Sequence, residues 1–356
     1  MKTRLFFAVL AIGILVVPGK GVAQNFPIQI FERYLEPLAQ QIGMPGLSAL
    51  IIRNNNLEWS RGYGYADVEN KTPATIDTPF PIGGVTQAIT GVLTGICVDR
   101  FQLEVDQPMQ SFVPAYPHPA SVRQVLAHAS EGRFRYDAAA YAALTAVIEK
   151  CSQRPYRVAT VVEILDRLSM IKSVPGLDLA TPDGAPARAL FDPSEVQRYQ
   201  ALLREVAVPY RLLRGGGFSR SEYPAYGMDA AGGLVATARD LFYFERELDD
   251  RDDNIPLSAS TLDKMWSQQV FDLGNQQTLT TPTGLGWFVQ YPSGVKLVWT
   301  FGHIPNASSA LIVKMPHKRL TLILLSNSDA LTAGYNFEQG DVMTSPFVKL
   351  FLKLFI

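Results

Sequence analysis

The sequence predicts an α+β fold in which an antiparallel sheet, flanked by helices, is built from both ends of the chain. Strand-like runs lie near the start and near the end of the chain, whereas the long segment between them has mainly helical signals. With 356 residues, 47% of them hydrophobic, the chain can bury a sizeable core. We therefore expect residues 24–85 and 226–356 to form the sheet region and residues 86–225 to form an inserted, mainly helical region, together one unit.

The first residues have the pattern of a cleavable export signal. A basic start precedes an apolar run from Leu5 to Val17, and the small residues Gly21 and Ala23 fit a cleavage site. A membrane anchor is the competing interpretation, but this run is shorter than the ~20 residues that span a bilayer. We expect residues 1–23 to be a signal peptide and the mature protein to be periplasmic or extracellular, with no stable membrane anchor.

The first elements of the mature chain have clear local signals. Phe26–Ile42 has helical apolar periodicity. Gly46–Arg53 and Leu57–Tyr65 have the composition of two strands, joined by an asparagine-rich turn. Gly84–Arg100 is the second expected helix, because apolar residues recur along one of its faces.

The rest of the chain has a clear helix start in its middle region and strand-like runs near its end. In the middle region, Asp192 followed by Pro193 is a typical helix start. Four β-rich runs then lie near the end of the chain: Gly284–Gln290, Val295–Thr300, Ser308–Met315 and Arg319–Leu325. Pro346–Phe355 is expected to be a terminal helix packed on the sheet, and Asp249–Asn254 a solvated acidic loop.

The charge balance argues against polyanionic partners. The chain carries 32 Lys and Arg against 33 Asp and Glu, and without the signal region 29 basic residues face 33 acidic ones, a net charge of −4. A phosphate backbone attracts basic surfaces, so nucleic acid is not an expected partner. The four histidines lie far apart in the sequence, with no metal-ligand spacing, so neither a metal nor a cofactor is expected.

Two cysteines, Cys97 and Cys151, leave two interpretations open. An exported protein matures in an oxidising compartment, where the two could form a disulfide. Alternatively, they are two small buried residues, since Cys97 lies within an expected helix and Cys151 near the end of another.

A series of motifs occurs in a fixed order along the chain. They are Phe80–Gln87, Leu126–Ser130, Tyr136–Ala138, Ala231–Leu234, Gly284–Trp287 and Gly302–Pro305. Their combined order resembles the serine β-lactamase and penicillin-binding protein family, especially its branch of class C β-lactamases, D-alanyl-D-alanine carboxypeptidases and esterases. The resemblance covers nearly all of the mature chain and implies a β-lactamase/transpeptidase-like fold.

The resemblance also shows what has been replaced. In this family a serine at the start of the central helix attacks an acyl carbon, and a lysine one turn later helps take its proton. Here the serine position is Gly84 and the lysine position is Gln87. Glycine has no side chain that could attack, and glutamine does not titrate.

The other two motifs are also changed. Tyr136 stands at the position of the family's tyrosine, but Ala138 replaces its asparagine partner. The third motif keeps His303, whereas Pro305 replaces a glycine and removes a backbone donor. Two other Ser-x-x-Lys patterns, at Ser169 and Ser293, are explained better by chance.

These changes favour an exported, catalytically inactive homologue that retains a cleft for a ligand or partner. The family-equivalent cleft positions are Gly84, Gln87, Tyr136, Ala138 and His303. By resemblance, the ligand would be a peptidoglycan-like peptide, an acyl ester or a β-lactam. One alternative is residual or rerouted activity of esterase, D-amino-acid peptidase or β-lactamase type, with Tyr136 or His303 as acid or base and water as nucleophile. A second is a structural exported protein with a filled cleft.

Overall fold

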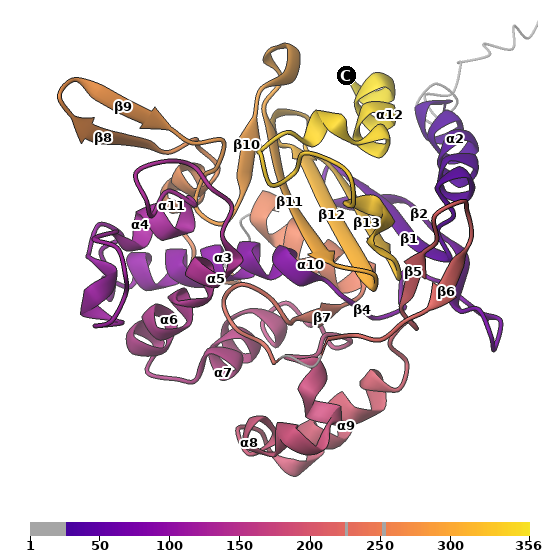
Figure 1. Ribbon diagram of the computed structural model, residues 1–356, viewed down its shortest axis with the longest axis horizontal. Helices are drawn as coiled ribbons and strands as arrows, with labels where there is room; N and C mark the ends of the chain where they lie inside the picture. The colour runs from indigo at the N-terminus through magenta and orange to yellow at the C-terminus, as the bar shows by residue number, and fades with distance from the viewer. Residues whose placement is uncertain (1–25, 225–226, 251–253) are drawn as a thin grey trace, which may run out of the picture.

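The central element of the protein is a seven-stranded antiparallel sheet, seen in a computed structural model that describes residues 26–224, 227–250 and 254–356 (Figure 1). The strand order is β10-β11-β12-β13-β1-β2-β3. The strands are β1 (Gly46–Arg53), β2 (Asn56–Asp67), β3 (Thr72–Pro73), β10 (Phe288–Gln290), β11 (Leu297–Ile304), β12 (Ser308–Met315) and β13 (Leu320–Ser326). Because β1 lies between β13 and β2, both chain ends form one sheet, which confirms the predicted α+β fold.

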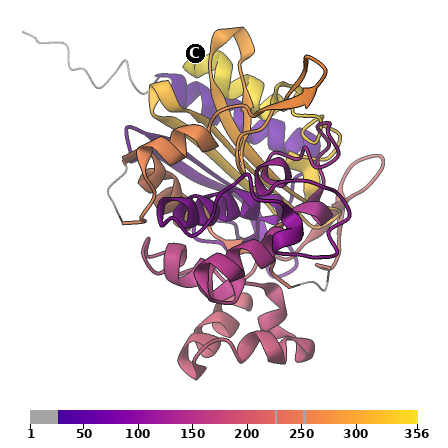
Figure 2. The same cartoon turned by 90° about the vertical axis from the view of Figure 1, so that its left-hand side faces the viewer.

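The two faces of the sheet are buried against different helices. Successive side chains of a strand point to opposite faces, so Leu311 and Val313 of β12 enter one core, and Ala310 and Ile312 the other. The first core is shared with α2 (Phe26–Ile42) and α12 (Pro346–Phe355). The second is shared with α3 (Thr86–Asp99) and α10 (Ala238–Asp250), as the two views show (Figures 1 and 2).

The terminal helix packs as the sequence predicts. Phe347 and Phe351 of α12 are fully buried, and the Phe351 ring makes an edge contact with Phe31 of α2, with 6.2 Å between centroids. Among the described residues, no helix combines the length and the apolar composition that crossing a bilayer requires. The predicted signal peptide lies outside the described residues.

A layer of shorter helices follows α3 in the chain. These are α4 (Val122–Leu126), α5 (Ala138–Ala142), α6 (Leu144–Ser152), α7 (Tyr156–Thr160), α8 (Ala185–Arg188) and α9 (Pro193–Leu203), with α11 (Ala259–Met265) later. The start of α9 is the one predicted, because the Asp192 side chain accepts a hydrogen bond from the Glu195 amide and the Glu195 side chain accepts one from the Asp192 amide.

Three small β-pairs were not predicted. They are β4 (Phe80–Pro81) with β7 (Val235–Ala236), β5 (Tyr210–Leu212) with β6 (Phe218–Arg220), and β8 (Val270–Gly274) with β9 (Gln277–Thr280). The β8–β9 hairpin projects away from the main sheet (Figure 1). These strands are too short for a periodic signal, and tertiary pairing decides their structure.

The predicted strand Gly284–Gln290 is wrong in its first half, because β10 begins at Phe288. The glycines before it serve close packing instead. A Cβ at Gly284 would lie 1.8 Å from the Met265 carbonyl oxygen, and one at Gly286 would lie 2.7 Å from that of Gln87. Met265 belongs to α11 and Gln87 to α3. Only glycine permits the chain to pass so close to these two helices.

Two further expectations are settled by the structure. Cys97 of α3 and Cys151 of α6 form a disulfide, so the alternative of two unpaired cysteines is wrong. The prediction of a solvated loop over Asp249–Asn254 is also wrong at its start. Asp249 belongs to α10, and its carboxylate forms an ion pair with Lys314 beneath the sheet. Residues 251–253 lie outside the described residues.

Candidate binding pocket at the start of helix α3

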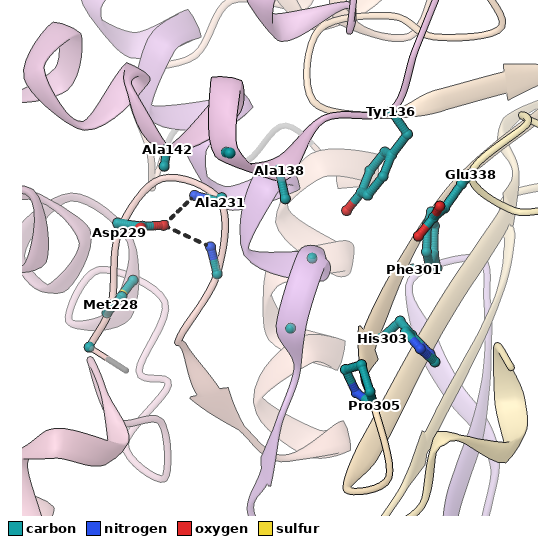
Figure 3. Close-up of a pocket in the computed structure, with 15 residues that line it drawn as sticks. Tyr136, Ala138, Ala142, Met228, Asp229, Ala231, Phe301, His303, Pro305 and Glu338 are labelled. Carbon is teal, nitrogen blue, oxygen red and sulfur yellow. Dashed lines mark hydrogen bonds between the residues drawn. The ribbon is translucent and has the colours of Figure 1, made fainter. Parts of the chain in front are cut away.

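A pocket of about 660 Å³ lies between the start of α3, the end of β11 and the turn that precedes β7 (Figure 3). The family-equivalent positions that line it are Gly84, Tyr136, Ala138 and His303. The fifth such position, Gln87, is buried behind Tyr136 and lines a much smaller cavity. Segments far apart in the sequence therefore meet here.

The serine position has no room for a side chain. Gly84 lies in a single 3-10 turn, Gly83–Val85, which leads into α3 and packs against β11. A Cβ added at Gly84 would lie 2.8 Å from the Phe301 carbonyl oxygen and 2.8 Å from the Tyr136 hydroxyl oxygen. Real Cβ contacts are longer than this, so Tyr136 occupies the space that a serine at this position would need.

A chain of hydrogen bonds leads from the protein interior to this tyrosine. The Asp137 main-chain amide donates to Nδ1 of His128 at 3.2 Å. Nδ1 is therefore the acceptor nitrogen, and Nε2 carries the hydrogen that it donates to Oε1 of Gln87, also at 3.2 Å. Nε2 of Gln87 then donates to the Tyr136 hydroxyl oxygen at 3.0 Å.

This chain is electrically neutral. Burial lowers the pKa of His128 to about 3 from its usual 6.5, which keeps the imidazole uncharged at neutral pH. Burial also raises the pKa of Tyr136, so the phenol stays protonated. A family lysine at position 87 would supply a cation beside this phenol, and Gln87 does not.

The remaining predicted positions lie on the open side of the pocket. His303 is partly buried near the end of β11, where its Nδ1 lies 2.8 Å from the Thr332 hydroxyl. Ala138 is exposed at the start of α5, and Pro305 is exposed just beyond β11. The structure thus places His303 at the pocket beside the Thr332 hydroxyl, and none of the described residues that line the pocket is a serine, threonine or cysteine.

Two carboxylates at the pocket were missed from the sequence. Asp229 accepts hydrogen bonds through Oδ1 from the amides of Ala231, at 2.8 Å, and Gly232, at 3.2 Å. Such a turn is typical of Asp two or three residues before glycine, so its position beside the Ala-Gly-Gly-Leu motif was a usable signal. Glu338 lines the opposite side of the pocket and lies in an irregular segment, where no pattern marks it.

The other Ser-x-x-Lys patterns are not part of this pocket. Ser169 lies in a turn after the π-helical end of α7, and Ser293 lies in the turn between β10 and β11. Neither serine lines the pocket. Across the described ranges, no group of three or more His, Cys, Asp and Glu side chains is arranged to hold a metal ion.

The fold and the pocket together define a protein of the serine β-lactamase and penicillin-binding class. A family model described as Beta-lactamase matches residues 31–338, so the chain belongs to this family. This match confirms the resemblance seen in the motifs.

Individual relatives match over shorter segments. Over 102 residues the chain is 31% identical to the mitochondrial serine beta-lactamase-like protein LACTB of Mus musculus, covering 28% of this chain and 18% of that protein. Over 87 residues it is 33% identical to a beta-lactamase of Pseudomonas fluorescens, covering 24% of each. The aligned segments thus cover less than a quarter of these relatives.

Solved structures show the same fold over most of the chain. A structure titled as the octameric penicillin-binding protein homologue from Pyrococcus abyssi superposes with a TM-score of 0.68 at 23% identity, covering 85% of this chain and 74% of that one. A structure titled as SurE gives a TM-score of 0.70 at 23% identity, covering 92% and 77%.

Proposed function

We propose that this protein is an exported, catalytically inactive member of the family that binds a ligand non-covalently in the pocket at the start of α3. One observation carries the proposal. The position of the family's nucleophile, Gly84, has neither a side chain nor space for one, while the pocket beside it stays open.

The surrounding groups support the loss of acyl-enzyme chemistry. A nucleophilic hydroxyl needs a neighbouring base, and the residues one turn along α3 and across from it are a neutral amide and a protonated phenol. In subtilisin, loss of the nucleophile alone lowers turnover by about 10⁶-fold. Pro305 also has no amide hydrogen to offer an oxyanion at the end of β11.

The size of the pocket supports a binding role over a purely structural one. Small-molecule sites have volumes of about 300–1,000 Å³, and the pocket volume of about 660 Å³ lies within this range. The ligand classes that the family suggests are peptidoglycan-like peptides, acyl esters and β-lactams. A peptide or ester of modest size fits such a volume.

Export is supported by two independent features. The first is the signal-like pattern of residues 1–23. The second is the Cys97–Cys151 disulfide, because structural disulfides persist in oxidising compartments. Expression with and without residues 1–23, followed by fractionation, tests export: the full chain should reach the periplasm or the medium in a shortened form.

The inactive state is tested by turnover assays. Purified protein should hydrolyse p-nitrophenyl butyrate and a chromogenic cephalosporin no faster than a heat-denatured sample. Reproducible turnover that follows the folded protein through purification contradicts the proposal.

A second candidate function is hydrolysis by an activated water molecule. It is favoured by the position of His303, which lines the pocket and has its Nδ1 fixed by Thr332. If this function holds, His303→Ala abolishes the ester turnover, and Tyr136→Phe lowers it. Equal rates in wild type and both variants dismiss these residues as an acid or base.

A further inference from the structure

The pocket carries negative charge on two sides. Asp229 and Glu338 lie on opposite sides of it, with Ala138 of α5 between them (Figure 3). Asp229 is partly buried, whereas Glu338 is exposed at the rim. A ligand in the pocket therefore lies between two carboxylates.

Neither a lysine nor an arginine balances these carboxylates among the described residues. The described residues that line the pocket include neither lysine nor arginine, and neither Asp229 nor Glu338 takes part in an ion pair with a described residue. The guanidinium of Arg157 comes close to the pocket beside Gly227, but both of its terminal nitrogens bind the carboxylate of Asp178, at 2.7 and 2.8 Å. The local field therefore favours a positive ligand group.

The second feature is a hydrogen-bond donor at the inner end of the pocket. The Tyr136 hydroxyl oxygen already accepts from Gln87, and the direction of that bond follows from the chain that begins at the Asp137 amide. The hydroxyl hydrogen has no acceptor among the described residues, and the hydroxyl lies next to Gly84 at the pocket wall. It is free to donate to a carbonyl or ester oxygen of a ligand.

The walls between these polar groups are apolar. Ala138, Ala142 and Met228 line one side, and Phe301 lines the other (Figure 3). An apolar wall with a few placed polar groups is the usual composition of a small-molecule site, in which the polar groups fix orientation.

We infer that the pocket, with the carboxylates of Asp229 and Glu338 on its opposite sides, selects a ligand that carries a protonated amine and a neutral carbonyl group, the carbonyl accepting from the Tyr136 hydroxyl, over a ligand that carries a carboxylate. This inference rests on the proposed binding function and adds the chemical class of the ligand. Among the ligands that the family suggests, it favours an amino-terminal peptide or an amino ester over a β-lactam with a free carboxylate.

Three matched dipeptides test this selectivity. Alanyl-alanine amide has a free amine and no carboxylate, N-acetyl-alanyl-alanine has the reverse, and N-acetyl-alanyl-alanine amide is neutral. Each is titrated in its L,L and D,D form at low ionic strength, with affinity measured by ligand-observed NMR. In the preferred stereoisomer the cationic peptide should bind about tenfold more tightly than the carboxylate peptide, and added salt should reduce the difference.

The variant Asp229→Asn/Glu338→Gln removes both charges with little change in shape. The asparagine side chain keeps an oxygen that can accept from the amides of Ala231 and Gly232, so the turn is preserved. In this variant the cationic peptide should bind no more tightly than the neutral peptide. Glu104→Gln, an exposed acid beyond the other end of α3, is the control and should leave all affinities unchanged.

The outcomes separate the two proposals. Equal binding of all three peptides, or tighter binding of the carboxylate peptide, overturns the selectivity and leaves the binding function standing. Failure of all three to bind overturns both proposals. Loss of the cationic preference in the double variant, with the neutral peptide unaffected, supports the assignment of the two carboxylates.

Discussion

Two buried polar clusters in this molecule differ in charge. Beneath the sheet, Nζ of Lys314 lies 2.8 Å from a carboxylate oxygen of Glu245 and 2.9 Å from one of Asp249, and the lysine side chain is completely buried. At the inner end of the pocket, the buried groups are Gln87 and His128, joined to the Tyr136 phenol, and all are neutral.

The difference follows from the partners that surround a buried ammonium group. An ammonium group can be buried where carboxylates oppose it, because the desolvation cost is then offset by ion pairing. Lys314 has two such partners and also lies over the Trp266 ring, 4.5 Å from its centroid. At position 87 the hydrogen-bond partners of the side chain are neutral, so an amide fits without a counter-ion. The replacement of the family's lysine by Gln87 therefore also removes the positive charge from this cluster.

The largest expected effect comes from breaking the charged cluster. Lys314→Met leaves Glu245 and Asp249 buried together without a cation, and it should lower the free energy of unfolding by about 3–5 kcal/mol. Urea denaturation measures this change. The control is Lys349→Met on the exposed face of α12, where the expected change is within about 0.5 kcal/mol. Similar losses in the two variants contradict the account of a compensated ion cluster.

The neutral cluster should instead make the free energy of unfolding depend on pH in the acid range. The pKa of His128 is lowered to about 3 in the folded protein, so between that pH and about 6.5 the unfolded chain binds the extra proton. The stability that depends on neutral His128 is therefore fully present above pH 6.5 and is lost as the pH falls, by about 1.4 kcal/mol per pH unit.

The variant His128→Asn isolates this effect. Unfolding free energies at pH 6.5 and pH 4.5 should differ less in the variant than in wild type, by about 2–3 kcal/mol. His317→Asn, at an exposed position in the turn between β12 and β13, should keep the wild-type dependence. An unchanged slope in His128→Asn shows that this histidine is not held neutral.

A smaller effect is expected from adding one methyl group at the serine position. Gly84→Ala forces a Cβ against Tyr136 and the Phe301 carbonyl, and it should destabilise the protein by about 1–3 kcal/mol. Gly232→Ala in the same pocket is the control, since its Cβ would meet no atom closer than 3.7 Å. Thermal melts of both variants, alone and with Tyr136→Phe, measure the difference. If Tyr136 fills this space, Tyr136→Phe partly relieves the cost of Gly84→Ala.

The sequence predicted the frame of the molecule better than its pocket. Long periodic segments such as Phe26–Ile42 and Ser308–Met315 have the predicted bounds, because burial on one or both faces gives a strong pattern. The short hairpins and the late start of β10 had no such pattern, since they depend on tertiary pairing and close packing. The predicted division at residues 85 and 225 stays a prediction.

At the pocket, motif positions located the residues but not their interactions. The replacement of a serine by Gly84 was visible in the sequence, whereas the occupation of its space by the Tyr136 hydroxyl was not. The hydrogen-bonded link between Gln87 and His128 joins residues 41 positions apart, and Glu338 lies in a segment with no periodicity. Such contacts follow from the packing of distant segments, which local patterns do not encode.

Covalent labelling tests the central claim most directly. The protein is incubated with a fluorescent penicillin, denatured and examined by gel fluorescence and intact-mass spectrometry, beside an active penicillin-binding protein as positive control. The account predicts an unlabelled chain of unchanged mass, because the start of α3 has no attacking oxygen. A stoichiometric adduct that survives denaturation and maps to a serine of this chain would contradict it.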